Sequence, residues 1–420
     1  MIAAYWRLLT AQPRFLAFGF LLAFISSFGQ TFYIALFSGE IRASFHLSHG
    51  QFGEAYSVAT LTSGLLLAFV GKRIDHIDLR HYAFILVIGL AIACLGMSLS
   101  AGVISLGIGI FMLRLFGQGL LSHAAVTSMA RYFDASNRGK AVSFAALGFP
   151  GGEAVFPLMG VGLMIWLGWR DAWLLSAIVI VGLLPMAIYW LLRDQRKRHQ
   201  AYLDARAQVS ATDVDTGDQT VQQVLRDWRF YLAMTALAGP SFVITGIFFH
   251  QVHLVAEKGW SLSLFASGVA IYAGFQLTTG VLSGPLVDRH GARFVARFYQ
   301  APYVLALLAL GLIDQWYGGL AFMVLAGAAS GFSSNIKTTL WAELYGTRNL
   351  GGIRAMTAAI DVVASALSPA LLGWAIDAGV SINSLIVMCA GHASYSVALL
   401  SLMYRHQKYR RTSETLSPDP

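Results

Sequence analysis

The sequence predicts an all-α membrane protein with twelve transmembrane helices arranged as two six-helix, pseudo-symmetric bundles. Three observations predict this fold class. The 420-residue chain is 56% hydrophobic and only 12% charged, whereas soluble domains contain about 25% charged residues. Apolar runs of about 20 residues, long enough to cross a bilayer of roughly 30 Å, recur along the chain. Sequence patterns of the first half also return in the second half.

The apolar runs predict the twelve spans in order, and each run is bounded by charged, glycine-rich or proline-containing segments. The predicted spans are 15–37, 52–71, 81–101, 104–130, 140–165, 171–192, 229–254, 262–286, 294–313, 317–341, 352–377 and 382–404. The polar segment 193–228 has no spanning pattern. We therefore expect an N-terminal six-helix bundle over 1–192, a cytoplasmic linker loop over 193–228, and a C-terminal six-helix bundle with a short cytoplasmic tail over 229–420.

The positive charges predict the orientation of the chain. The predicted outer loops contain only Arg42, Arg170 and Lys258, while nearly all the other Lys and Arg residues, of 29 in total, lie at the termini and in the inner loops. Because Lys and Arg accumulate on the cytoplasmic side, both termini are expected in the cytoplasm. The expected location is the plasma (inner) membrane.

A polar decapeptide occurs twice between apolar runs. It reads GKRIDHIDLR at Gly71–Arg80 and GPLVDRHGAR at Gly284–Arg293, 213 positions later (from 71 to 284). Gly139 likewise corresponds to Gly351, and the prolines 18 positions after each also match. Two matches at nearly one offset indicate an internal duplication.

These sequences resemble the major facilitator superfamily over the whole chain. The decapeptides are similar to its signature in the loops after the second and eighth spans, and RLFGQG (Arg114–Gly119) is similar to its fourth-span motif. The resemblance implies a secondary active transporter that works by alternating access, with a rocker-switch motion of two halves around a midplane site. In the family, the loop acid pairs across the cytoplasmic interface. The resemblance therefore implies a conformational gate at Gly71, Asp75, Arg80, Gly284, Asp288, Arg289 and Arg293.

Four charged side chains fall inside predicted spans, at Arg114, Glu153, Lys337 and Asp361. Each costs at least about 2.5–3.5 kcal/mol at the bilayer centre, so each is a candidate functional residue. In the family the corresponding arginine faces the central cavity, which implies that Arg114 contacts substrate. A permanent ion pair between Arg114 and Glu153 is the alternative. Glu153 and Asp361 are the candidates for proton coupling.

Polar residues at helical spacing extend this site. Gln118 follows Arg114 by four positions and shares its helix face, and Gln30 and Tyr33 belong to a polar stripe on the first span. In the family, spans 1, 4, 7 and 10 line the cavity. Gln30, Tyr33, Gln118, Lys337 and His250 are therefore substrate-binding candidates beside Arg114. Lys337 can equally snorkel to the inner interface, and His250 is equally a packing residue or a proton sensor.

The sequence RYFDASNRGKA resembles the span-4 to span-5 signature of the monocarboxylate and oxalate/formate branch. The residues that fit its pattern are Tyr132, Phe133, Arg138 and Ala141. This resemblance implies a small organic anion such as a monocarboxylate, moved with protons or by exchange. The alternative is a proton-driven multidrug or cation efflux antiporter, in which Glu153 or Asp361 binds the drug or carries the proton. A membrane sensor without flux is a third possibility.

Other functional classes are disfavoured. The sequence contains no P-loop pattern G-x-x-x-x-G-K-[ST] and no catalytic motif, so we expect no enzyme activity, no cofactor and no metal site. The net charge of +8 follows from the membrane orientation, so nucleic-acid binding is not expected. The expected partners are a small-molecule substrate, a proton or counter-substrate, and the lipid bilayer, with the protein as a monomer.

Overall fold

The structure is a computed structural model that describes residues 2–75, 77–195, 198–200, 221–346 and 349–405. These parts of the chain form helices and contain no β-strand. Large apolar side chains are exposed on the outside of many helices, and they include Leu65, Ile85, Ile104, Val281 and Met388. Such an outer surface suits lipid rather than water. The structure therefore confirms the predicted all-α membrane protein.

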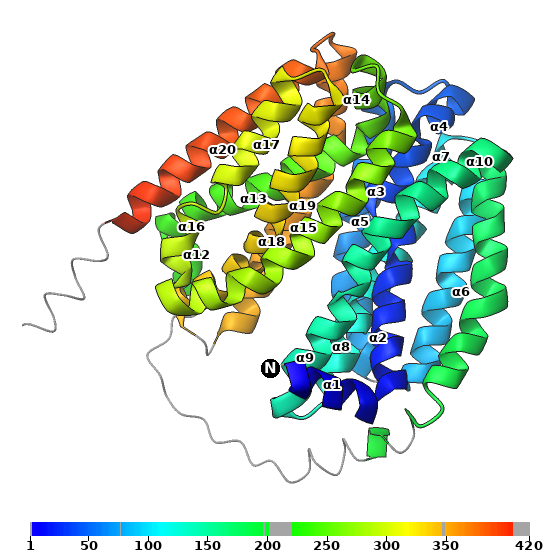
Figure 1. Cartoon of the computed structure of the whole chain (residues 1–420). Coiled ribbons are helices and arrows are strands. Elements are labelled where there is room, and N and C mark those ends of the chain that lie inside the picture. The colour runs from blue at the N-terminus through cyan, green and yellow to red at the C-terminus, as the bar shows by residue number, and fades with distance from the viewer. Residues whose placement is uncertain (1, 76, 196–197, 201–220, 347–348, 406–420) are drawn as a thin grey trace, which may run out of the picture.

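The chain forms two groups of helices, coloured blue to green and green to red in Figure 1. The first group consists of α1 (Ile2–Ala11), α2 (Pro13–Ile25), α3 (Thr31–Ile34), α4 (Ser38–Phe45), α5 (His49–Val70), α6 (Leu79–Ser98), α7 (Val103–Met112), α8 (Ser122–Tyr132), α9 (Ala135–Ala146) and α10 (Gly148–Leu191). The second consists of α12 (Val221–Arg226), α13 (Trp228–Phe249), α14 (Gln251–Glu257), α15 (Leu262–His290), α16 (Ala292–Ala296), α17 (Ala301–Leu312), α18 (Trp316–Tyr345), α19 (Leu350–Asp377) and α20 (Ile382–Arg405).

Within the described residues, ten helices are long and apolar enough to cross a membrane, and a bent pair forms an eleventh crossing. One of the ten, Asn137–Leu191, is 55 residues long and would extend about 80 Å if it were straight. Its chain turns at Gly168, where φ is 77° and ψ is 169°, a conformation that glycine adopts readily. The predicted spans 140–165 and 171–192 lie on either side of this turn. All twelve predicted spans are therefore matched by apolar helices.

The first span is broken, which the sequence-based prediction of a continuous helix over 15–37 missed. A 3₁₀ turn (Ser26–Gly29) ends α2, Gln30 is extended with φ −81° and ψ 149°, and α3 then begins. The two parts of the span meet at 45°. Serine and glycine have low helix propensity, so the sequence SSFGQ favours a break here.

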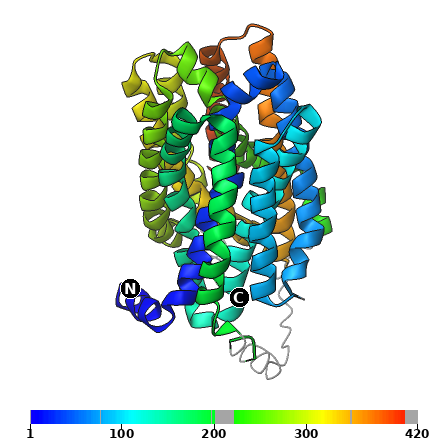
Figure 2. The same ribbon diagram turned by 90° about the vertical axis from the view of Figure 1, so that its right-hand side faces the viewer.

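The helix α1 lies across one end of the molecule in both views (Figures 1 and 2), close to α9. We call this end, where α1, α9 and α12 lie, the linker end, and the opposite end, with α4 and α14, the far end. Trp6 of α1 is 66% exposed, which suits a helix lying in the membrane interface.

Two helix pairs join the first half of the chain to the second. The helix α5 packs against α19, and α10 packs against α15. The proposed division into 1–192, 193–228 and 229–420 remains a prediction, since 196–197, 201–220 and 406–420 lie outside the described residues. Within the predicted linker, the structure describes the short helix α12, whose Val224 is buried beside Phe230 in a cluster formed by the second half.

Candidate functional site

The broken first span and the fourth span touch backbone to backbone. The fourth span is π-helical over Leu113–Leu121, between α7 and α8, and π-helical segments are frequent at functional sites. Its Gly117 packs against Gly29, and a Cβ atom on either glycine would overlap the backbone of the other helix. This close approach brings the break in the first span next to Arg114.

Arg114 is buried in the first half, with 5% of its surface exposed. Its Nη1 donates to the Gly29 carbonyl oxygen at 3.1 Å and lies 3.4 Å from Thr31 Oγ1. The guanidinium carbon lies 5.3 Å from the centre of the Tyr56 ring, and the Tyr56 hydroxyl donates to Thr31 at 2.8 Å. The ion pairs of the described residues do not include Arg114 with Glu153. Arg114 therefore holds the backbone at the break.

A cavity of about 130 Å³ lies between the two halves of the chain, beside this break. The residues lining it are Gln30, Thr31, Phe32, Gln118, Glu153, Ile244, Thr245, Phe248, Val269 and Tyr272. Among these residues, Glu153 of α10 is the charged one, and its Oε2 is buried with no hydrogen-bond partner in the described structure. The cavity thus combines one carboxylate with two carboxamides, three hydroxyl groups and aromatic rings.

Hydrogen bonds from the second half support the walls of this central cavity. The Gln251 Nε2 of α14 donates to the Phe32 carbonyl oxygen at 2.8 Å, and both groups are buried. The Tyr272 hydroxyl lies 2.7 Å from the Ser330 hydroxyl of α18. Because these bonds fix Phe32 and Tyr272, residues from both halves hold the cavity in shape.

The second half contains its own charged cluster. The Lys337 Nζ of α18 lies 2.9 and 2.8 Å from the two carboxylate oxygens of Asp361 on α19. The Ser241 hydroxyl of α13 accepts from Lys337 at 3.1 Å and donates to Asp361 at 3.3 Å. Ser241 also lines a neighbouring cavity of about 200 Å³, together with Tyr299, Gln300, Tyr303 and serines of α18. The two opposite charges therefore neutralise each other within the C-terminal half.

Comparison with protein families decides the identity of this fold. The family model described as Major Facilitator Superfamily matches residues 19–369. The chain belongs to the major facilitator superfamily. Its members are secondary transporters with a substrate site near the bilayer midplane, between two halves. The family therefore supports a membrane transporter, and the role of the central cavity remains a prediction.

Solved structures with this fold include two crystal structures of a bacterial homologue of the human lysosomal transporter Spinster. Both are inward-facing, one unoccupied and one occupied, and both superpose with a TM-score of 0.63 at 15% sequence identity. The alignment covers 94% of this chain and 97% of the unoccupied structure, or 93% and 96% for the occupied one. None of the curated proteins searched matches the chain. The likeness establishes the fold, while the narrower resemblance to the monocarboxylate and oxalate/formate branch remains a prediction.

The structure brings together only some of the residues that the sequence singled out. Gln30, Gln118 and Glu153 line the central cavity of this superfamily member. Tyr33, although near in sequence, is fully buried among aromatic rings that include Phe156 and Trp173. Their roles in binding remain predictions.

The other candidates have protein partners. The snorkelling alternative for Lys337 is not what the structure shows, because its ammonium is paired with Asp361. His250 is buried and its Nε2 lies 3.1 Å from the Pro369 carbonyl oxygen. Its neighbour Gln251, which the sequence did not single out, makes one of the hydrogen bonds between the halves. The only signal for it was its place in a polar cluster with His250 and His253 after the apolar run of the seventh span.

The second copy of the superfamily's loop signature forms the end of α15 and the start of α16. Asp288 and Arg289 are exposed. Arg293 instead contacts Glu343 of α18, whose carboxylate accepts from the amides of Ala292 at 2.6 Å and Arg293 at 3.2 Å. The structure therefore anchors this signature within the second half.

Arg80 of the first copy also binds within its own half. The Arg80 Nη2 donates to the Leu192 carbonyl oxygen at 2.6 Å and its guanidinium lies over the Tyr189 ring. Gly71 begins a 3₁₀ turn that ends at Asp75, and the Asp75 side chain lies outside the described residues. The gate role of both copies remains a prediction.

Proposed function

We propose that the protein is a proton-coupled secondary transporter that moves a small neutral or cationic organic solute by alternating access. The substrate would occupy the central cavity, and Glu153 would bind and release the coupling proton. The observation that carries this proposal is the placement of Glu153, a carboxylate lining the cavity between the halves with no hydrogen-bond partner for its Oε2. A carboxylate in this position can change its protonation without breaking an existing contact.

The positive charges support a neutral or cationic solute over the organic anion that the branch resemblance implies. An anion would need a free cation in the cavity for charge-assisted pairing. Arg114 instead donates to the backbone of the first span, and Lys337 pairs with Asp361. Neither residue is among those lining the central cavity.

The dimensions of the cavity support a small solute over a large drug. Its volume of about 130 Å³ is below the roughly 300–1,000 Å³ of pockets for drug-sized ligands. Gln30 and Gln118 offer donors and acceptors, while Phe32 and Phe248 offer apolar faces. A compact solute with at least one hydrogen-bonding group fits this lining.

The conformation and membrane setting follow from the same proposal. Hydrogen bonds of Asp377 with the start of α5 join the halves near the far end. This supports a state that is open toward the linker end. The excess of Lys and Arg in the predicted inner loops supports a cytoplasmic linker end and cytoplasmic termini. We propose the plasma membrane as the location and a monomer as the working unit.

A thermal-shift screen of the purified protein tests the substrate class, because any ligand that binds the native state raises the Tm by mass action. The panel contains small carboxylates, sugars, amino acids and lipophilic cations, each at pH 6 and pH 8. We expect stabilisation by neutral or cationic compounds that depends on pH and is changed in Glu153→Gln. Stabilisation by carboxylates that is lost in Arg114→Ala and kept in Glu153→Gln would overturn the proposal in favour of an organic-anion transporter.

A further inference from the structure

The two halves of the chain are joined at the far end by a carboxylate that crosses between them. Asp377, the last residue of α19, accepts hydrogen bonds from three groups at the start of α5. Its Oδ2 accepts from the Ser48 hydroxyl at 2.6 Å and from the Gly50 amide at 2.8 Å, and its Oδ1 accepts from the His49 amide at 3.0 Å. An acid at the N-terminus of a helix also interacts favourably with the helix dipole.

A second acid, from the N-terminal half, accepts a hydrogen bond from the C-terminal half. The Trp374 Nε1 of α19, one turn before Asp377, donates to Glu54 Oε1 of α5 at 2.5 Å. Gly50 and Gly53 of α5 lie so close to α19 that a side chain at Gly53 would overlap the backbone of Pro369. Each half therefore supplies one acid to the other at this seam.

The start of α5 does not need Asp377 to remain helical. Ser48 is already its N-cap, because the Ser48 hydroxyl accepts from the Gln51 amide at 3.1 Å and the Gln51 side chain accepts from the Ser48 amide at 3.0 Å. Such a capping box stabilises the helix end by itself. When Asp377 moves away, three donors need new hydrogen bonds with water, namely the amides of His49 and Gly50 and the Ser48 hydroxyl. The contact can therefore break and form again without unfolding α5.

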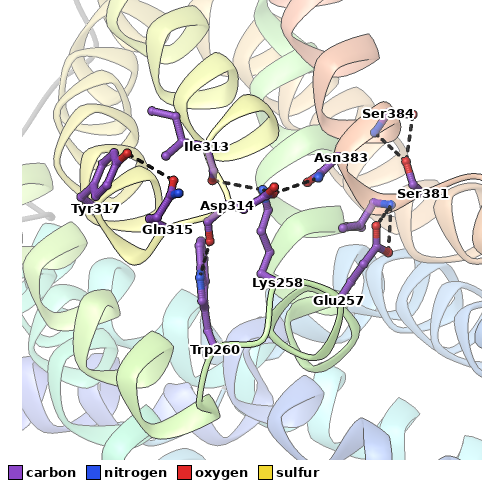
Figure 3. Close-up of polar contacts among 11 residues, drawn as sticks. Glu257, Lys258, Trp260, Ile313, Asp314, Gln315, Tyr317, Ser381, Asn383 and Ser384 are labelled. Carbon is purple, nitrogen blue, oxygen red and sulfur yellow. Dashed lines mark hydrogen bonds and ion pairs between the residues drawn. The ribbon is translucent and has the colours of Figure 1, made fainter.

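Hydrogen bonds join the loops of the C-terminal half at the far end into a cap (Figure 3). The Lys258 ammonium donates to Asp314 at 2.8 Å and the Asn383 side chain donates to the same carboxylate at 3.2 Å. The Ile382 amide, at the start of α20, lies 3.1 Å from both carboxylate oxygens of Glu257. These bonds tie the loops before α15, α18 and α20 together without involving the Asp377 side chain, which belongs to the same half as the last residue of α19.

At the other seam, the part of the chain that the structure describes has no acid of the N-terminal half bonded to the helix start. The N-terminus of α15, which faces α10 in the duplicated arrangement, is capped by its own Ser261, whose hydroxyl accepts from the Leu264 amide at 3.1 Å. The acid that binds a helix start across the two halves is therefore found at the α5–α19 pair and not at the α10–α15 pair of the described structure.

We propose that Asp377 is a gating residue that latches the far side of the transporter shut by holding the start of α5, and that it must release α5 each time the protein opens toward that side. This inference rests on the alternating access of the proposed function but not on the role of Glu153 or on the identity of the solute. Losing Asp377 removes its charge-assisted hydrogen bonds to the start of α5. These bonds exist only in the state that is closed at the far end.

The test measures the separation of the halves directly. Nitroxide spin labels are placed at Ala43 and Ser263, which are exposed and lie near the far end on opposite halves, after Cys94 and Cys389 are changed to Ala. Distance distributions from electron–electron double resonance are then recorded in lipid nanodiscs for the otherwise wild-type protein, Asp377→Asn and Asp377→Ala. Asp314→Asn is the matched control, because Asp314 is an acid at the same end whose bonds stay within its own half.

We expect the ratio of long to short distances to rise about tenfold in Asp377→Ala, and by less in Asp377→Asn, which keeps one acceptor, because charge-assisted hydrogen bonds stabilise by about one factor of ten or more. Asp314→Asn should leave the distribution unchanged. Unchanged distances in both Asp377 variants, with a monodisperse gel-filtration profile, would overturn the latch. Because no solute or proton gradient is used, failure of the latch leaves the role of Glu153 untouched, and failure of proton coupling leaves the latch untouched.

Discussion

The charged residues of the two halves are arranged in opposite ways. In the first half, Arg114 bonds to backbone at the break of its neighbouring span, and Glu153 faces the central cavity with a free Oε2. In the second half, Lys337 and Asp361 pair at 2.8 Å. Protonating a paired carboxylate breaks an ion pair, whereas protonating Glu153 breaks no contact. Location inside the membrane therefore does not by itself identify a candidate proton carrier. Whether the carboxylate is already held in an ion pair matters as well.

The largest effect should come from Glu153→Gln, which keeps the size of the side chain and removes its titration. We expect solute accumulation driven by a pH gradient in liposomes to fall to the level of passive equilibration, because glutamine cannot bind and release the coupling proton. Exchange of labelled for unlabelled solute should continue, because it needs no net proton movement. Asp361→Asn is the comparison variant, and an equal loss of gradient-driven accumulation in that variant would erase the contrast between the halves.

Arg114→Ala should have the next largest effect, and it should act on stability. The substitution removes the donor to the Gly29 carbonyl and leaves a buried void, so the free energy of unfolding should fall by about 2–4 kcal/mol. Thermal unfolding followed by tryptophan fluorescence measures the change, with Arg114→Lys as the partial replacement. If Arg114→Ala kept its Tm and lost only solute binding, Arg114 would be a substrate contact as the branch resemblance implies.

The ion pair of the second half should give a smaller, coupled effect. Lys337→Met leaves Asp361 without its cation, which should cost about 1–2 kcal/mol, less than for a fully buried pair because both side chains are about one-quarter exposed. The double variant Lys337→Met/Asp361→Leu should return close to the wild-type Tm. A double variant that is as unstable as the sum of the single variants would show that the two charges do not act as a pair.

The smallest effect should come from Asp314→Asn in the cap at the far end. Hydrogen bonds from Lys258 and Asn383 lower the pKa of Asp314 below its usual value. A depressed folded pKa stabilises the protein above the unfolded value of about 3.9 and loses this effect as the pH falls through the folded pKa. The Tm of Asp314→Asn should therefore be slightly lower than that of the wild type at pH 7, and this difference should be smaller at pH 3. An equal difference at both pH values would exclude the charge as its cause.

The family was predicted from the repeated loop decapeptide and the RLFGQG motif. Hydropathy and charge were sufficient to predict the spans, because a bilayer requires long apolar helices whatever their packing. The same reasoning identified Glu153 and Gln118, which line the cavity. It did not predict the break at Gln30 or the π-helical segment, because low helix propensity at SSFGQ is a weak signal and the contact of Gly29 with Gly117 joins different spans. It also missed the pairing of Lys337 with Asp361 and of Asp377 with Ser48, since such pairs depend on the register between helices that are far apart in sequence.

The most direct test of proton carriage by Glu153 is to measure proton movement during transport. The protein is reconstituted in liposomes containing a pH-sensitive dye, and the compound that stabilises it most in the thermal-shift screen is added outside. We predict that the wild type and Asp361→Asn shift the internal pH with the solute, while Glu153→Gln produces no shift although it still exchanges solute. A pH shift of wild-type size in Glu153→Gln would contradict proton carriage by this residue.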